Sequence, residues 1–202
     1  RGRKLRKKSH ILLGRYLADQ MSEVYSLQQH RKAFCLGNIM PDLRPSFLTT
    51  RHEFFGTFSQ LQEKMRELIE RNPEEDNARV YWRRFGEVMH YMADYFTFPH
   101  NRTYKGSLAE HNSYEAELKN CLKECILSGN ADSQLEEAKH FDSFEELVGY
   151  IRERHACYLE SPRCIADDIR FILRVCYQVI QGIFQLCLRR QFHMEGRPVT
   201  AI

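Results

Sequence analysis

The sequence predicts an all-α protein, built as one bundle-like domain of several helices. Three observations support this prediction: apolar residues recur at helical spacing, strand-like alternation is hard to find, and several candidate helix starts carry capping signals. We expect a single domain over residues 1–202, because a chain of this length buries a full core without disulfide staples. Hydrophobic residues make up 43% and charged residues 28%, which are ordinary values for a globular protein.

The apolar spacing and the helix-breaking residues set the expected helices. These cover residues 9–25, 27–36, 50–71, 77–96, 107–127, 133–140, 143–160 and 162–190. A loop over residues 37–47, containing Pro41 and Pro45, is expected between the second and third helices. Three of the helix starts show the capping-box pattern, in which a serine hydroxyl and a glutamate three residues later cap each other's backbone N–H groups. These pairs are Ser107 with Glu110, Ser133 with Glu136, and Ser143 with Glu146.

The two ends of the chain differ from its middle. Residues 1–8 carry six cations and are expected to form a basic N-terminal arm, and residues 191–202 a loose tail. The most apolar stretch, Ile169–Leu188, is interrupted by a stripe of Arg and Gln, which is typical of a buried helix rather than a membrane span. Because no secretory signal is visible, we expect a cytoplasmic protein.

Seven cysteines are present, and an odd number in a chain of this size indicates reduced, mostly buried thiols. Cys121 and Cys125 are four residues apart and share a helix face. A zinc site of the cysteine type needs two more soft ligands at a matching spacing, and none is apparent. We therefore do not expect a cysteine zinc site.

Histidine and carboxylate pairs form the most informative pattern. His90 and Asp94 are four residues apart on one predicted helix, and His111 and Glu115 are four apart on the next, with His100 between. Residues four apart project from the same face of a helix, so each pair can bind one metal ion. A single such pair is usually only a surface pair. Two pairs and a third histidine within 26 residues favour a metal centre with two ions.

Further residues of the same types lie upstream, and together they resemble a known family. The segments that carry the resemblance are Ser9-His10, Gly37–Asp42, Arg51-His52, Gly86–Asp94, Pro99-His100, and His111 with Glu115. The sequence resembles the zinc-dependent phospholipase C family of bacteria, which is related in fold to fungal zinc nucleases that cut single-stranded nucleic acid. The resemblance covers residues 9 to 115, which is about half of the chain.

This resemblance implies a three-zinc centre and a role for each residue. His52, His90 and Asp94 would hold one zinc ion, and His100, His111 and Glu115 a second. His10 would hold the third, with Asp94 bridging it to the first. Asp42 would act as the general base and could also contact metal. Secreted members complete the third site with an N-terminal Trp, whereas the only Trp here is Trp82, so two or three ions are expected.

The family resemblance implies a phosphodiesterase of the phospholipase C type, which releases a diglyceride and a phosphorylated head group. Two alternatives stay open: a nuclease or small-molecule phosphoesterase on the same site, and a regulatory protein that binds metal without turnover. Tyr95 and Phe98 are candidates to border the substrate pocket, with core packing as the alternative. The expected partners are a phospholipid or another phosphodiester, with peripheral membrane contact, and the basic arm suits anionic lipid and nucleic acid equally. The sequence leaves the oligomeric state open.

Overall fold

A computed structural model describes residues 2–44, 52–71 and 77–194, without side-chain detail for residues 2–7 and 192–194. Within these ranges the chain forms helices and no strand, which confirms the all-α prediction. The elements are α1 (Gly2–Gln20), α2 (Tyr25–Gln29), α3 (Arg31–Gly37), α4 (Met40–Leu43), α5 (Phe54–Glu70), α6 (Ala78–Tyr95), η2 (Phe98–His100), α7 (Leu108–Leu127), η3 (Asp132–Gln134), α8 (Phe144–Glu160) and α9 (Ile165–Met194).

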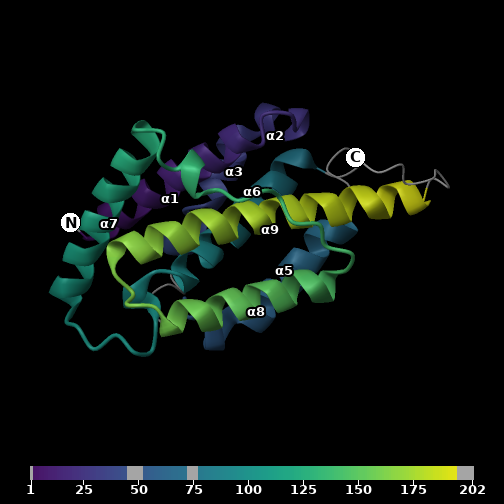
Figure 1. Ribbon diagram of the computed structural model, residues 1–202. Helices are drawn as coiled ribbons and strands as arrows, with labels where there is room; N and C mark the ends of the chain where they lie inside the picture. The colour runs from purple at the N-terminus through teal and green to yellow at the C-terminus, as the bar shows by residue number, and fades with distance from the viewer. Residues whose placement is uncertain (1, 45–51, 72–76, 195–202) are drawn as a thin grey trace.

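The long helix α9 runs the length of the molecule and is its central element (Figure 1). It packs against α5, α6, α7 and α8, and Leu173, Val179 and Ile183 on it have no exposed surface. By length and composition its Ile165–Gln191 stretch could cross a membrane, but most of that stretch is buried against the other helices. Of its polar stripe, Arg174 and Gln178 bind the backbone of the segment that precedes α8.

Helices α3 and α6 cross at a pair of glycines. A Cβ atom on Gly37 would lie 2.0 Å from the carbonyl oxygen of Arg83, and one on Gly86 would lie 2.1 Å from that of Phe34. Only glycine permits this approach, because any side chain would collide with backbone that cannot move aside. The two helices therefore come close enough for the chain after α3 to touch the middle of α6.

An aromatic cluster holds the same crossing from the other side. The ring of Trp82 stacks on Phe85 at 5.5 Å and meets Phe34 edge-on at 6.5 Å. Its indole N–H donates to the Ser26 hydroxyl at 3.0 Å. Trp82 is thus a core residue of α6, with both its ring and its polar atom satisfied.

The prediction of a helix over residues 133–140 is wrong. Only the 3-10 turn η3 forms there, and the Ser133–Glu136 cap is not made. The buried side chain of Gln178 on α9 accepts a hydrogen bond from the backbone N–H of Lys139 at 2.7 Å and donates to the carbonyl of Glu137 at 2.8 Å. These long-range bonds satisfy the backbone of the segment without a helix.

The other two caps are found in the structure. Ser107 and Glu110 form the complete capping box of α7. Ser143 accepts from the backbone N–H of Glu146, but the Glu146 carboxylate accepts from the N–H of Asp142 instead of returning to Ser143. The start of α8 is therefore as predicted, with one bond shifted by a residue.

Several further boundaries differ from the expectations. Helix α1 begins at Gly2, so the backbone of residues 2–8 is helical rather than a separate arm, and it ends at Gln20. The helix expected over 27–36 is two helices that meet at His30, and the expected loop contains α4, with Pro41 in its first turn. Helix α9 continues through residues 191–194 of the expected tail, and residues 195–202 lie outside the described chain, as do residues 45–51.

Candidate metal centre

The structure brings all eight expected ligands together at one place in the fold. They come from α1 (His10), α4 (Asp42), the residue pair before α5 (His52), α6 (His90, Asp94), η2 (His100) and α7 (His111, Glu115). They form three groups, and in each group the potential ligand atoms lie within 4.8 Å of one another. The first two groups share His90, so we call the five residues His10, Asp42, His52, His90 and Asp94 the inner half. The third group, His100, His111 and Glu115, is the outer half.

Asp94 is the hub of the inner half. Its Oδ2 atom lies 3.0 Å from Nδ1 of His52 and 3.2 Å from Nε2 of His90. Its Oδ1 atom lies 3.2 Å from Nε2 of His10, on the other side of the carboxylate. Oδ2 is also 3.8 Å from Nδ1 of His100, which links the inner half to the outer half. The two oxygens of this buried carboxylate thus face different histidines.

Asp42 adds a buried carboxylate oxygen that lacks a partner. Its Oδ1 atom lies 3.8 Å from Nε2 of His90, while its Oδ2 atom is buried with no hydrogen-bond partner among the described residues. A buried carboxylate oxygen without a donor is costly. A cation or a bound water at this point would remove that cost.

The residues of the outer half are brought together by the four-residue spacing of two of them on α7 and by the turn η2, which carries the third. Nε2 of His111 lies 2.7 Å from Oε1 of Glu115, one turn further along α7. Nε2 of His100, from η2, approaches the same oxygen at 3.3 Å. The ring centroids of the two histidines are 5.3 Å apart. This arrangement confirms that the two residues four apart share a face and that His100 folds back beside them.

The distances fit a set of zinc ligands. A tetrahedral zinc ion with bonds of about 2.0–2.1 Å separates its ligand atoms by about 3.3 Å. The separations are 3.2 Å between His90 Nε2 and His52 Nδ1, and 3.0–3.3 Å for most of the histidine–carboxylate pairs. Imidazole and carboxylate are also the donors that zinc accepts. A small cavity of about 30 Å³ adjoins both halves, with His10, Asp94, His100 and Glu115 in its wall.

A backbone group orients the central histidine. Nδ1 of His90 donates to the carbonyl oxygen of Asn38 at 2.8 Å, which leaves Nε2 as the acceptor that faces the cluster. The contact exists because Gly37 and Gly86 let α3 and α6 approach closely. Side-chain spacing alone does not identify Asn38, since the group involved is a carbonyl that every residue carries. Its only sequence signal is its place in the Gly37–Asp42 segment.

The crowding of charges shifts three pKa values. Burial opposes the charged form of Asp94, but the histidines around it outweigh burial and hold the pKa of Asp94 well below its usual range. Burial also opposes charge on His90, yet the nearby Asp94 carboxylate raises the pKa of His90 overall. Burial and the neighbouring His90 lower the pKa of His10. Protons and a metal ion therefore compete for the same nitrogen atoms.

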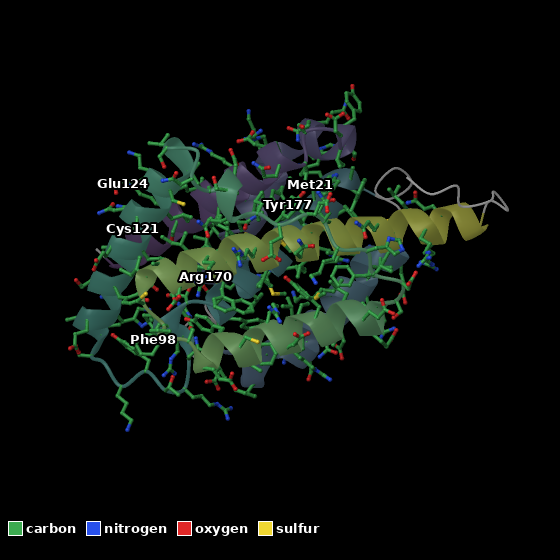
Figure 2. All side chains as sticks on the ribbon, in the orientation of Figure 1. Met21, Phe98, Cys121, Glu124, Arg170 and Tyr177 are labelled. Atoms are coloured by element: carbon green, nitrogen blue, oxygen red, sulfur yellow. The ribbon has the colours of Figure 1, made fainter. Side chains whose placement is uncertain are left out.

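The two aromatic residues proposed for the substrate pocket lie elsewhere. Tyr95 has no exposed surface, and its hydroxyl is hydrogen-bonded to that of Thr57 at 2.8 Å, so it belongs to the core. Figure 2 shows Phe98 beside the segment that joins α8 to α9, where Arg163 lies over its ring at 5.4 Å. Neither residue lines the cavity next to the cluster. Tyr95 is therefore a core residue, and Phe98 packs against Arg163 outside the wall of this cavity.

Two buried carboxylates near the centre were not expected from the sequence. Glu87, one turn before the ligands of α6, forms ion pairs with Arg44 at 2.7 Å and Lys64 at 3.4 Å. The Arg44 pair ties the chain just after Asp42 to α6. Asp168 on α9 is completely buried. Both residues act across long sequence separations, which spacing rules do not capture.

Fold and geometry together thus define a helical protein with a cluster of histidines and carboxylates that could hold metal. The family model described as zinc dependent phospholipase C matches residues 9–165, and the chain belongs to this family. The match includes all eight candidate ligands. No curated protein and no solved structure gives a significant match. All seven cysteines are free thiols, but only Cys176 and Cys187 are buried, so the expectation of mostly buried thiols is wrong. None joins the candidate metal groups found among the described residues.

Proposed function

We propose that this protein is a zinc-dependent phosphodiesterase of the phospholipase C type. The observation that carries the proposal is that two neighbouring ligand groups share His90 and that Asp94 contacts histidines of both, so that candidate ion positions lie side by side. Neighbouring ions of this kind suit the in-line displacement at a phosphodiester. We propose two or three zinc ions, with the inner half holding one or two and the outer half holding one.

The chemistry of the ions and of the chain can be separated. Bound zinc supplies positive charge for the phosphodiester and lowers the pKa of water to about 7. The chain supplies ligands in fixed positions, with His90 oriented by the carbonyl of Asn38. It also supplies a base: Oδ2 of Asp42 is buried and accepts no hydrogen bond from the described residues, so it can receive the proton of the attacking water.

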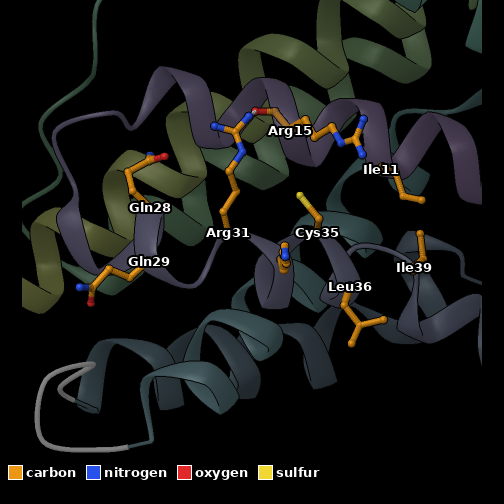
Figure 3. Close-up of a pocket in the computed structure, with 9 residues that line it drawn as sticks. Ile11, Arg15, Gln28, Gln29, Arg31, Cys35, Leu36 and Ile39 are labelled. Carbon is orange, nitrogen blue, oxygen red and sulfur yellow. Dashed lines mark hydrogen bonds between the residues drawn. The ribbon is translucent and has the colours of Figure 1, made fainter.

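A surface groove formed by the first helices supports the proposal of a phospholipid substrate and of contact with a membrane. The groove runs between α1 and α2–α3, has a volume of about 700 Å³, and is shown in Figure 3. Its walls contain three cationic, three apolar and two amide side chains and one thiol: Arg15, Arg31, Lys32, Ile11, Leu36, Ile39, Gln28, Gln29 and Cys35. Two of its apolar residues are chain neighbours of the centre: Ile11 follows His10, and Ile39 follows Asn38, whose carbonyl group contacts His90.

The charges of this groove suit an anionic lipid head group. The Arg31 guanidinium is held by Asp19 at 2.6 Å and by the Arg15 carbonyl at 3.1 Å, which leaves the side chains of Arg15 and Lys32 to meet a phosphate. Among the described residues, no acidic side chain lines the groove. The combination of cations with the exposed Leu36 favours a lipid over a nucleic acid, which has no acyl chain to bind.

A side-by-side substrate test distinguishes the proposed function from its alternatives. The zinc-loaded chain is incubated with phosphatidylcholine in mixed micelles, with single-stranded DNA and with a chromogenic phosphodiester, and Asp42→Asn serves as the control. We expect release of phosphorylated head group by the wild type and not by the control. Faster cleavage of DNA than of lipid would establish the nuclease alternative. A zinc-loaded protein that cleaves none of them would be a regulatory metal-binding protein.

Vesicle flotation tests the membrane contact separately. We expect binding to vesicles that contain phosphatidylserine, and a loss of about tenfold or more in the Arg15→Gln/Lys32→Gln variant, because each cation near an anionic surface contributes about 1 kcal/mol. The matched control is Arg79→Gln/Arg152→Gln, which removes the same charge from exposed positions on α6 and α8. Equal losses in the two variants would show a general charge effect and no docking groove.

A further inference from the structure

One buried carboxylate outside the ligand set makes an unusual set of contacts. Asp168, in the first turn of α9, has no exposed surface. Its Oδ2 atom accepts hydrogen bonds from the backbone N–H of Phe98 and from the hydroxyl of Tyr114, each at 2.9 Å. Its Oδ1 atom accepts from the hydroxyl of Tyr158 at 2.7 Å. The carboxylate therefore joins η2, α7 and α8 to α9.

Burying this carboxylate lowers the stability of the fold. All three donors are neutral, and no ion pair to Asp168 occurs in the part of the chain that the structure describes. Burial raises the pKa of Asp168 to about 6. A buried charge without a cation usually lowers stability relative to a neutral side chain of similar size. The use of a carboxylate here is therefore better explained by what it holds in place.

Two of the three donors lie next to metal ligands of the outer half. Phe98 is two residues before His100 in the same 3-10 turn. Tyr114 directly precedes Glu115 and is three residues, about one helical turn, after His111. Both bonds end on Oδ2, so a single oxygen atom links the turn that carries His100 to the helix that carries the other two ligands. The third donor comes from α8, which carries no ligand.

We propose that Asp168 is a positioning residue for the outer half of the metal centre. It sets the separation between η2 and α7, and with it the zinc affinity of His100, His111 and Glu115, without touching the ion. The inference rests on zinc binding at this centre, as in the proposed function. Asparagine is a weaker replacement. Its neutral amide oxygen gives up the charge that strengthens the bonds from Phe98 and Tyr114, and its NH₂ group faces Tyr158, whose hydroxyl can then only accept.

The first test is a zinc titration of the metal-free full-length chain in competition with a chromophoric chelator. We expect Asp168→Asn to weaken one class of site by about 10–100-fold, the usual effect of changing a residue that orients a metal ligand. In a His90→Ala background, where the outer half remains, the loss should persist. In a His111→Ala background, where the outer half is already broken, Asp168→Asn should cause no further loss. An equal loss in both backgrounds would overturn the positioning role.

A matched pair of tyrosine variants tests the same claim and does not depend on the folding of Asp168→Asn. Tyr114→Phe and Tyr158→Phe each remove one hydroxyl from the same carboxylate. We expect both to lower thermal stability, but only Tyr114→Phe to weaken zinc binding by roughly tenfold, since only Tyr114 is bonded to Oδ2 next to the ligands. Equal zinc affinities in the two variants would contradict the inference.

These outcomes separate this inference from the proposed function. A wild-type chain that binds no zinc would overturn both. Normal zinc binding in all the Asp168 and tyrosine variants would overturn only the role of Asp168. Zinc binding that responds as expected, in a chain that cleaves no phosphodiester, would leave the positioning role in place and overturn the proposed function.

Discussion

The inner and outer halves of the metal centre are built in different ways. The inner half collects its residues from positions 10 to 94, on α1, α4, α6 and the chain before α5, and all five are buried. The outer half takes its three residues from positions 100 to 115, and two of them, His100 and His111, are half-buried. The inner half therefore depends on how helices pack, whereas the outer half depends mainly on a helical spacing and on the turn before it.

The supports of the two halves differ accordingly. The inner half relies on the glycine crossing of α3 and α6, which delivers the Asn38 carbonyl to His90. The outer half has the complete cap at Ser107 and the contacts of Asp168. A change in packing should thus damage the inner half first, while a local change on α7 should leave the inner half intact.

The largest expected effect comes from removing one ligand of each half. His90→Ala should lower kcat/KM by at least about 10³-fold and empty the inner half of its one or two ions, because His90 belongs to both ligand groups there. His111→Ala should lose about one ion and keep the inner half occupied. Zinc content by elemental analysis and kcat/KM with a phosphodiester measure both. Loss of the outer ion in His90→Ala, or of the inner ions in His111→Ala, would contradict the division into two halves.

Asp42→Asn is expected to act on turnover rather than on metal content. The amide keeps the size of the side chain but cannot accept the proton, so kcat should fall by about 10²–10⁴-fold with little change in KM. Zinc content should stay as in the wild type. Full activity of this variant would remove the general-base role, and loss of zinc would make Asp42 chiefly a ligand.

A pair of glycine variants tests whether packing supports the inner half. Gly86→Ala places a Cβ atom 2.1 Å from the Phe34 carbonyl and should lower the free energy of unfolding by about 3 kcal/mol, with weaker zinc binding in the inner half. Gly149→Ala on α8 meets no atom within 4 Å and should be neutral or stabilising by about 1 kcal/mol. Urea unfolding of the metal-free proteins measures both, and equal stabilities would contradict the role of the crossing.

The smallest expected effect is the pH dependence of stability that His155 causes. Measured in the metal-free protein, it is independent of metal loss at low pH. Burial lowers the pKa of His155 to about 4, and its ring stacks on Phe54 at 3.9 Å. Because the unfolded chain binds this proton first, stability should fall as the pH drops below about 6.5, by roughly 1 kcal/mol at pH 5.5. His155→Phe should lack this part of the pH dependence in the metal-free protein. An unchanged profile would show that His155 is not responsible.

The sequence carried the local features of the fold and the site. Spacing along the chain sets the helices over residues 77–96, 107–127 and 143–160, and the structure confirms them. It also sets the contacts of His90 with Asp94 and of His111 with Glu115, four residues apart. The helix expected over residues 133–140 failed because Gln178, about 40 residues away, satisfies its backbone. The roles of Asn38 and Asp168 were not predicted, because they too depend on contacts between residues far apart in the sequence. Their partners are reached through tertiary packing and leave no periodic signal.

The central claim is that this chain holds zinc in an inner and an outer half. Elemental analysis of the purified full-length protein, with no metal added, measures it most directly. Two or three zinc ions per chain, falling by about one in His111→Ala, is the result that the two-part centre requires. A folded protein that contains no zinc and takes up none when zinc is added would contradict the account.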